Sequence, residues 1–216
     1  MVKIMEIRDL ARTDVLDYQQ LVSSLREYSK PRDRIGALLA DGSLIRVRKG
    51  LYVLGERYRR APLSREVLAN LISGPSYVSL DYALSSYGMI PERVADVTSI
   101  TMGQSRRFAT PFGVFTYRAF SQGRYVPGIR WAGEKDTRYL MASPEKALVD
   151  KVWTDKRFSP AKLGDFDTYL LEDLRLDEGR LSSLDRERCD AIARAFASRK
   201  IDMLLRYLAR RTGDRQ

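Results

Sequence analysis

The stretch "DYQQLVSSLREYSKPRDRIGALLADGSLIRVRKGLYVLG", Asp17–Gly55, contains two helix patterns followed by a hairpin pattern. Apolar residues recur at helical spacing over Val15–Tyr28, and Asp17 is a suitable N-cap for this first helix. A second helix is predicted to follow, with Ser29 as its cap, Pro31 in its first turn and an apolar stripe that ends at Gly42.

The last third of the stretch predicts a β-hairpin. Its two strands are "SLIRV" and "GLYVLG", joined through Arg48-Lys49-Gly50, and the preceding "MEIRDLARTD" can supply a short first helix. Two helices, the second with a basic first turn, and then a basic hairpin are the order of a winged helix-turn-helix. In that arrangement the second helix enters the major groove of DNA, and the hairpin, or wing, lies along the phosphates.

The distribution of charge agrees with this interpretation. The 216 residues carry a net charge of +10, and residues 30–60 hold nine cations against three acids, which is +6. Such a field attracts polyanions such as nucleic acid, although a solvated basic surface is the plainer alternative. The candidate DNA-binding residues are Lys30, Arg32 and Arg34 on the helix and Arg46, Arg48 and Lys49 on the hairpin.

These six cations are expected to make two kinds of contact with DNA. An arginine can hold guanine through two hydrogen bonds, so Arg32 or Arg34 is the candidate for a base contact. Arg46, Arg48 and Lys49 are candidates for phosphate contacts, which position the protein without specifying a sequence.

The rest of the chain predicts a second, mixed domain. A polar linker with Pro62 is followed by helix patterns over 63–74 and 80–87, and by β-rich segments between 97 and 142. Helix patterns return at "SPEKALVDKVW" and dominate the last third. We therefore predict an α+β fold with a winged helix-turn-helix over 1–60 and, over 61–216, a mixed α/β domain with a small sheet and a helical last third.

Two motifs in this second part permit a functional and a structural interpretation. Tyr77, Tyr82 and Tyr87 could form a binding surface, but a helix packed with its tyrosines in the core explains them better. The motif "SPEKALVD" contains Glu145, Lys146 and Asp150, which resemble a catalytic trio. Capping by Ser143 and Pro144 at the helix start explains the motif without any chemistry.

Several enzyme classes lack their usual residues here. The chain has no histidine and one cysteine, Cys189, so it can form neither an internal disulfide nor a Cys/His metal site. No lysine follows a carboxylate at the spacing of restriction-type nucleases, and Asp165 and Asp167 are explained as residues that cap a helix. We expect no catalytic residues, no cofactor and no metal.

The chain also lacks the segments that direct proteins into membranes. No apolar run reaches the roughly 20 residues of a membrane helix, and the N-terminus has no long apolar region of the kind that secretory signals contain. We expect a cytoplasmic protein with no membrane partner.

Three segments together resemble the AbiEi family of antitoxins, which belong to bacterial type IV toxin–antitoxin and abortive phage-infection systems. The segments are the opening stretch, "SYVSLDYALSSYGMIPE" (76–92) and "SPEKALVD" (143–150). The likeness extends through nearly the whole chain, with fewer motifs in the C-terminal third.

The resemblance implies a function for each part. A winged helix-turn-helix would repress the protein's own operon at inverted repeats, and the larger domain would neutralise a nucleotidyltransferase-like toxin without a stable complex. At matching positions the helix cations are Lys30, Arg32 and Arg34, and the wing cations are Arg46, Arg48 and Lys49. Two alternatives stay open: a stand-alone winged-helix transcription factor with a ligand-sensing or dimerising second domain, and a divergent metal-dependent nuclease.

Overall fold

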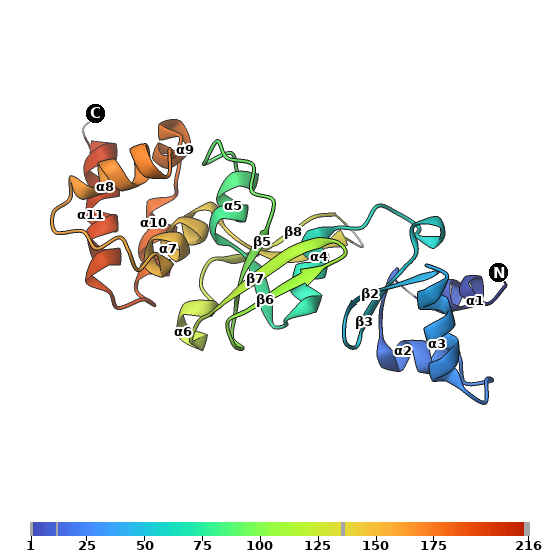
Figure 1. The fold of residues 1–216 in the computed structure, drawn as a ribbon. Helices are drawn as coiled ribbons and strands as arrows, with labels where there is room; N and C mark the ends of the chain where they lie inside the picture. The colour runs from blue at the N-terminus through green and yellow to red at the C-terminus, as the bar shows by residue number, and fades with distance from the viewer. Residues whose placement is uncertain (1, 12, 135–136, 214–216) are drawn as a thin grey trace.

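The fold was obtained as a computed structural model, which describes residues 2–11, 13–134 and 137–213 (Figure 1). These residues form eleven α-helices and two β-sheets, so the predicted α+β class is confirmed. In Figure 1 an N-terminal unit, a six-stranded sheet and a group of C-terminal helices follow one another along the molecule, with the two termini at opposite ends.

The N-terminal unit combines three helices with a three-stranded antiparallel sheet of order β1-β3-β2. Apolar side chains from every one of its elements pack into a single core, from Ile4 to Leu54. The elements are α1 (Val2–Leu10), β1 (Val15–Asp17), α2 (Tyr18–Ser24), α3 (Pro31–Ala40), β2 (Leu44–Arg48) and β3 (Leu51–Leu54).

The first predicted helix starts later than its periodicity indicated. Val15–Asp17 pairs with β3 as a strand, and the helix begins only at Tyr18. Asp17 is the N-cap, as predicted: its side chain accepts from the backbone N–H of Gln20 at 2.7 Å, and the Gln20 side chain accepts from the Asp17 N–H at 2.8 Å. The pairing of Val15–Asp17 depends on a partner 36 residues away, and the local pattern contains no sign of it.

The second helix and the hairpin occur where they were predicted. Pro31 occupies the first position of α3, but Lys30 rather than Ser29 is the N-cap residue, and no side chain caps this helix. Gly42 and Gly50 have φ of +74° and +85°, which other residues adopt only with strain, so these glycines end α3 and turn the hairpin.

The second sheet has the order β6-β7-β5-β4-β9-β8 and mixes parallel with antiparallel pairs. β4 pairs parallel with β9 and β5 with β7, which leaves β6 and β8 as edge strands. The β-rich segments predicted between 97 and 142 all occur, as β5 (Val97–Thr101), β6 (Arg106–Thr110), β7 (Gly113–Ala119), β8 (Ile129–Ala132) and β9 (Tyr139–Ala142). The sixth strand is β4 (Ser76–Val78).

Helices pack against this sheet and make up the end of the chain. The helices α4 (Arg65–Ile72), α5 (Leu80–Ser86) and α7 (Pro144–Thr154) match predicted patterns, whereas α6 (Gln122–Tyr125) was not anticipated. Within the last third, where helix patterns were predicted to dominate, the helical part of residues 159–174 consists of α8 (Asp165–Asp167) and a π-helical continuation (Thr168–Asp173). The remaining helices are α9 (Glu178–Ser182), α10 (Arg186–Ala193) and α11 (Arg199–Gly213).

The hairpin is less exposed than a free wing would be. Successive side chains of a strand point to opposite faces, so Tyr52 and Leu54 enter the N-terminal core, while Leu51 and Val53 belong to a second, larger core with α4 and the six-stranded sheet. Val47 of β2 joins that second core as well. The expectation of a hairpin projecting into solvent is therefore wrong for β3, whose four residues are all buried.

The segment after the hairpin is attached to the N-terminal unit. Arg60 donates to Asp14 at 2.8 Å and to the carbonyl of Ala11 at 3.0 Å, and the Arg59 Nε–H donates to the carbonyl of Leu54 at 2.9 Å.

No helix in the described part of the chain has the length and apolar character that crossing a bilayer requires.

Candidate nucleic-acid interface

The N-terminus of α3 and the side of α2 border an open groove with a volume of about 720 Å³. Most of its lining residues are polar or charged in type, although most of the lining surface is apolar, and the polar residues at the start of α3 are exposed. The lining residues are Tyr18, Gln19, Val22 and Ser23 from α2 and Ser29, Lys30, Pro31, Arg32 and Asp33 from the start of α3.

Arg32 is exposed, but it has a defined partner. Its Nε–H donates to the hydroxyl of Tyr18 at 3.0 Å, across the groove between α3 and α2. Tyr18 is half-buried and packs against the N-terminal core, so its hydroxyl is held by a rigid ring. Lys30, two residues earlier at the N-cap position, is exposed as well.

Arg34 lies in a different environment from Arg32. It is half-buried, and the centre of its guanidinium lies 5.9 Å from the ring centroid of Tyr28, within the range of a cation–π contact. Its positive charge also helps to lower the pKa of Asp41, after the larger effect of the hydrogen bonds from Ser43. Arg34 is therefore less accessible to a ligand than the exposed Arg32.

The three hairpin cations differ in their exposure. Arg46 and Lys49 are exposed, and the Arg46 guanidinium lies 5.8 Å from the ring centroid of Tyr52. Arg48 is half-buried, and its Nη1 donates to the carbonyl of Lys49 at 2.8 Å. Of these three, Arg46 and Lys49 are the better placed for an external phosphate.

None of the six predicted cations forms an ion pair with a carboxylate within residues 2–11, 13–134 and 137–213. Arginines elsewhere in the chain do so, such as Arg60 with Asp14. No carboxylate among the described residues therefore lies within ion-pair distance of these six cations.

The outward face of α3 carries only small residues beyond its first turn. Gly36, Ala37 and Ala40 are exposed, and no atom lies within 4 Å of the place where a Cβ at Gly36 would stand. Ile35 and Leu38 fill the opposite, buried face. A helix with such a surface can approach another molecule closely along its length.

Sequence reasoning did not find Tyr18. It follows the N-cap and lies within a helix pattern, where a tyrosine indicates packing, and its contact with a residue 14 positions away depends on how α2 and α3 cross. The sequence also did not indicate that the groove is lined by Gln19, Ser23 and Ser29. These residues lie near one another only because α2 and the start of α3 pack side by side.

The motif "SPEKALVD" forms a closed cluster in the core. Ser143 caps α7, as predicted, and Lys146 and Asp150 have no exposed surface. Lys146 Nζ lies 2.8 Å from Asp150 Oδ1. Asp150 Oδ2 accepts from the hydroxyls of Tyr77 at 2.9 Å and Ser79 at 2.8 Å.

The burial of this pair perturbs both groups. Removal from water lowers the pKa of Lys146 and raises the pKa of Asp150, and the attraction between the two opposes both shifts. Glu145 is 5% exposed, and it accepts from the backbone N–H of Asp185 at 3.2 Å. Because a substrate cannot reach these atoms in this conformation, the trio is a structural feature of the core.

The remaining motif residues are engaged within the protein. Besides Tyr77, the hydroxyl of Tyr82 donates to Glu66 and that of Tyr87 to the carbonyl of Ala142. The three tyrosines are packed with their hydroxyls bonded, as expected, but Tyr77 lies on the strand β4 and not on the helix, and Tyr82 and Tyr87 are half-buried. Asp165 is the first residue of α8 and does not cap it, because its carboxylate accepts from the backbone N–H groups of Ala161 and Lys162, which precede the helix. The capping interpretation is therefore wrong for Asp165, and Asp167 binds Tyr207 and Arg211 instead.

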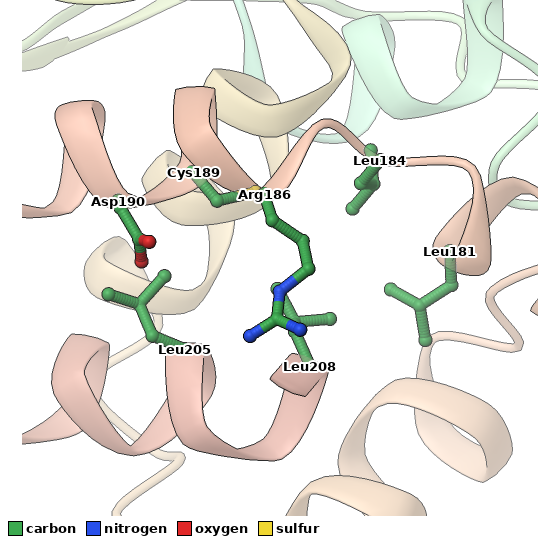
Figure 2. Close-up of a pocket in the computed structure, with 7 residues that line it drawn as sticks. All are labelled: Leu181, Leu184, Arg186, Cys189, Asp190, Leu205 and Leu208. Carbon is green, nitrogen blue, oxygen red and sulfur yellow. The ribbon is translucent and has the colours of Figure 1, made fainter. Parts of the chain in front are cut away.

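The best enclosed pocket lies between the last helices. Figure 2 shows Arg186, Cys189 and Asp190 of α10 facing Leu205 and Leu208 of α11 across it. Its volume is about 10 Å³, which is room for one water molecule at most. In the described residues no three His, Cys, Asp or Glu side chains come together as a metal site would require.

The chain was also compared with known proteins. No family model matches it, and no curated protein matches it.

Proposed function

We propose that this protein binds double-stranded DNA through α3 and the hairpin as a repressor of its own operon. We propose further that it acts in the cytoplasm as an antitoxin to a nucleotidyltransferase-like toxin, without a stable complex and without enzymatic activity. The observation that carries the DNA proposal is the group of cations at α3 and the hairpin that lack carboxylate partners among the described residues. Uncompensated cations that surround a helix N-terminus favour a polyanionic ligand.

Two further features support DNA as that polyanion. The order of elements α1-β1-α2-α3-β2-β3, with a sheet of order β1-β3-β2, agrees with a winged helix-turn-helix whose second helix enters the major groove. The small residues along the outward face of α3 offer no steric barrier to the groove. The antitoxin role depends only on the resemblance of the motifs to the AbiEi family.

The DNA proposal is tested by titrating the protein onto the duplex upstream of its own gene and onto a random duplex of the same length. We expect binding to both, tighter to the upstream DNA, with affinity that falls steeply as salt rises. Replacing Arg46 and Lys49 together by alanine should weaken both complexes and lower the salt slope by about one per lost phosphate contact.

Arg157→Ala is the matched control, because its side chain is 95% exposed and lies in the part of the chain that follows α7. It should leave both affinities unchanged. Absence of binding, or binding that salt does not weaken, would overturn the DNA proposal.

The antitoxin proposal is tested by expression beside a toxin with a Gly-Ser…Asp-x-Asp signature encoded by a neighbouring gene. We expect rescued growth, and separate elution of the two proteins in size-exclusion chromatography. Continued growth arrest in cells that contain both proteins would contradict this part of the proposal.

A further inference from the structure

The two arginines at the start of α3 differ in how accessible they are to a base. Arg34 is half-buried against Tyr28, whereas Arg32 is exposed on the rim of the groove beside α2. The sequence treats the two as equivalent candidates, and the structure separates them. Arg32 is the arginine that can reach a ligand without first leaving a protein contact.

The hydrogen bond to Tyr18 restricts how Arg32 can bind. A guanidinium is a planar group with five N–H donors, and the Nε–H of Arg32 is used by the Tyr18 hydroxyl at 3.0 Å. The two terminal amino groups have no hydrogen-bond partner within the described residues. They offer two parallel N–H donors at the end of the side chain, the geometry that suits a pair of neighbouring acceptors.

Guanine presents such a pair in the major groove, its O6 and N7 atoms, and the N-terminal residues of a recognition helix are those that face base edges. The exposed residues that follow Arg32 on α3 are Gly36, Ala37 and Ala40, so no bulky side chain keeps the helix away from the bases. Asp33, also exposed, disfavours a phosphate at the same place because it repels an anion.

We propose that Tyr18 is a positioning residue that orients Arg32, so that the two terminal amino groups of Arg32 bind O6 and N7 of one guanine. This inference rests on the proposed function of α3 as the helix that enters the major groove. It names the base that the helix reads, assigns the reading to Arg32 rather than Arg34, and gives Tyr18 a role in sequence preference.

The experiment starts with the full-length chain and a random duplex library, from which the preferred sequence is selected. Each guanine of that sequence is then replaced in turn by 7-deazaguanine, which lacks the N7 acceptor but still pairs with cytosine. We expect one guanine position at which this change weakens binding, and at which a change of the base pair weakens it roughly 5- to 150-fold.

Three variants locate the contact. Arg32→Ala should abolish the effect of 7-deazaguanine at that position, and Tyr18→Phe should reduce it, because the phenyl ring retains the packing but not the hydrogen bond. Arg34→Ala tests the rival assignment and should leave the effect of 7-deazaguanine intact, as should the control Arg157→Ala. The melting temperature of Tyr18→Phe should match that of the original protein, which separates orientation from folding.

The outcomes distinguish the inference from the function on which it rests. If the original protein selects no sequence and binds no duplex, the proposed function fails. If it selects a sequence but tolerates 7-deazaguanine at every position, or if Tyr18→Phe keeps full sensitivity, this inference fails while DNA binding stands. Tyr18→Phe combined with Arg32→Ala should be no weaker than Arg32→Ala alone, and an additive loss would show that Tyr18 acts independently of Arg32.

Discussion

The exposed cations around α3 and the buried Lys146 are basic side chains in opposite environments. Lys146 is enclosed: it pairs with Asp150, donates to the carbonyl of Arg124, and lies 4.6 Å from the ring centroid of Phe196. Lys49 is exposed and has no carboxylate partner among the described residues. A cation whose partners lie inside the protein stabilises the fold, whereas one without such partners remains available for a ligand.

The difference follows from the cost of removing charge from water. A buried ammonium needs a nearby carboxylate and hydrogen-bond acceptors, because an unpaired buried charge is destabilised by several kcal/mol. An exposed lysine is solvated and needs neither. The two regions should therefore respond in opposite ways when their cations are removed.

The largest expected effect on stability is that of Lys146→Ala. It leaves the Asp150 carboxylate buried without its cation, and we expect a loss of roughly 3–5 kcal/mol in the free energy of unfolding, measured by urea denaturation. Lys49→Ala is the matched change in the other region, and it should stay within about 0.5 kcal/mol of the original protein.

A second change tests the cause of that loss. Asp150→Asn added to Lys146→Met removes both buried charges, so the double variant should recover part of the stability that Lys146→Ala loses. Similar stabilities for Lys146→Ala and Lys49→Ala would show that the buried pair is not the distinction we describe.

The thiol of Cys189 provides an independent probe of the same contrast. Cys189 is 3% exposed, and burial is the largest of the causes that raise its pKa to about 12, so the reactive thiolate is scarce at neutral pH. A disulfide reagent should label it slowly in the native protein and quickly in urea. Labelling of Lys146→Ala should be roughly 150- to 5,000-fold faster than that of Lys49→Ala, the factor that corresponds to 3–5 kcal/mol, if it proceeds through unfolding. Rapid labelling of the unmodified native protein would contradict this.

A smaller effect is expected at Gly36, on the exposed side of the comparison. Its backbone is helical and a Cβ would meet no atom within 4 Å, so Gly36→Ala should stabilise the protein by up to about 1 kcal/mol. A bulky acid at the same place should keep the fold but repel DNA. We therefore expect Gly36→Glu to weaken duplex binding while Gly36→Ala leaves it unchanged. Equal DNA affinities for the two variants would remove α3 from the interface.

Local chemistry made several features predictable. Asp17, Ser143 and Pro31 mark helix starts by their capping or their fixed φ, and Gly42 and Gly50 mark turns because they adopt positive φ. Such signals act over a few residues, so they survive in any tertiary context. The positive charge at α3 and the hairpin was equally predictable, because it follows from the number of basic and acidic residues in that stretch.

Features that depend on distant neighbours were not predictable in this way. The strand Val15–Asp17 exists because β3 is beside it, and the burial of β3 on both faces requires the second part of the chain to pack there. The α7 residues Lys146 and Asp150 are four positions apart on one helix, but nothing in that spacing shows that both are enclosed with Tyr77.

The order of most helices and strands, their turns and the basic character of one end of the molecule thus come from the amino-acid sequence alone, since they depend on contacts of short range and on total charge. The tertiary structure determines which cations are buried and which are exposed, and it places the Tyr18 hydroxyl beside Arg32. The physical reason is that solvation and hydrogen-bond geometry depend on the neighbours in space, and chain order does not specify those neighbours.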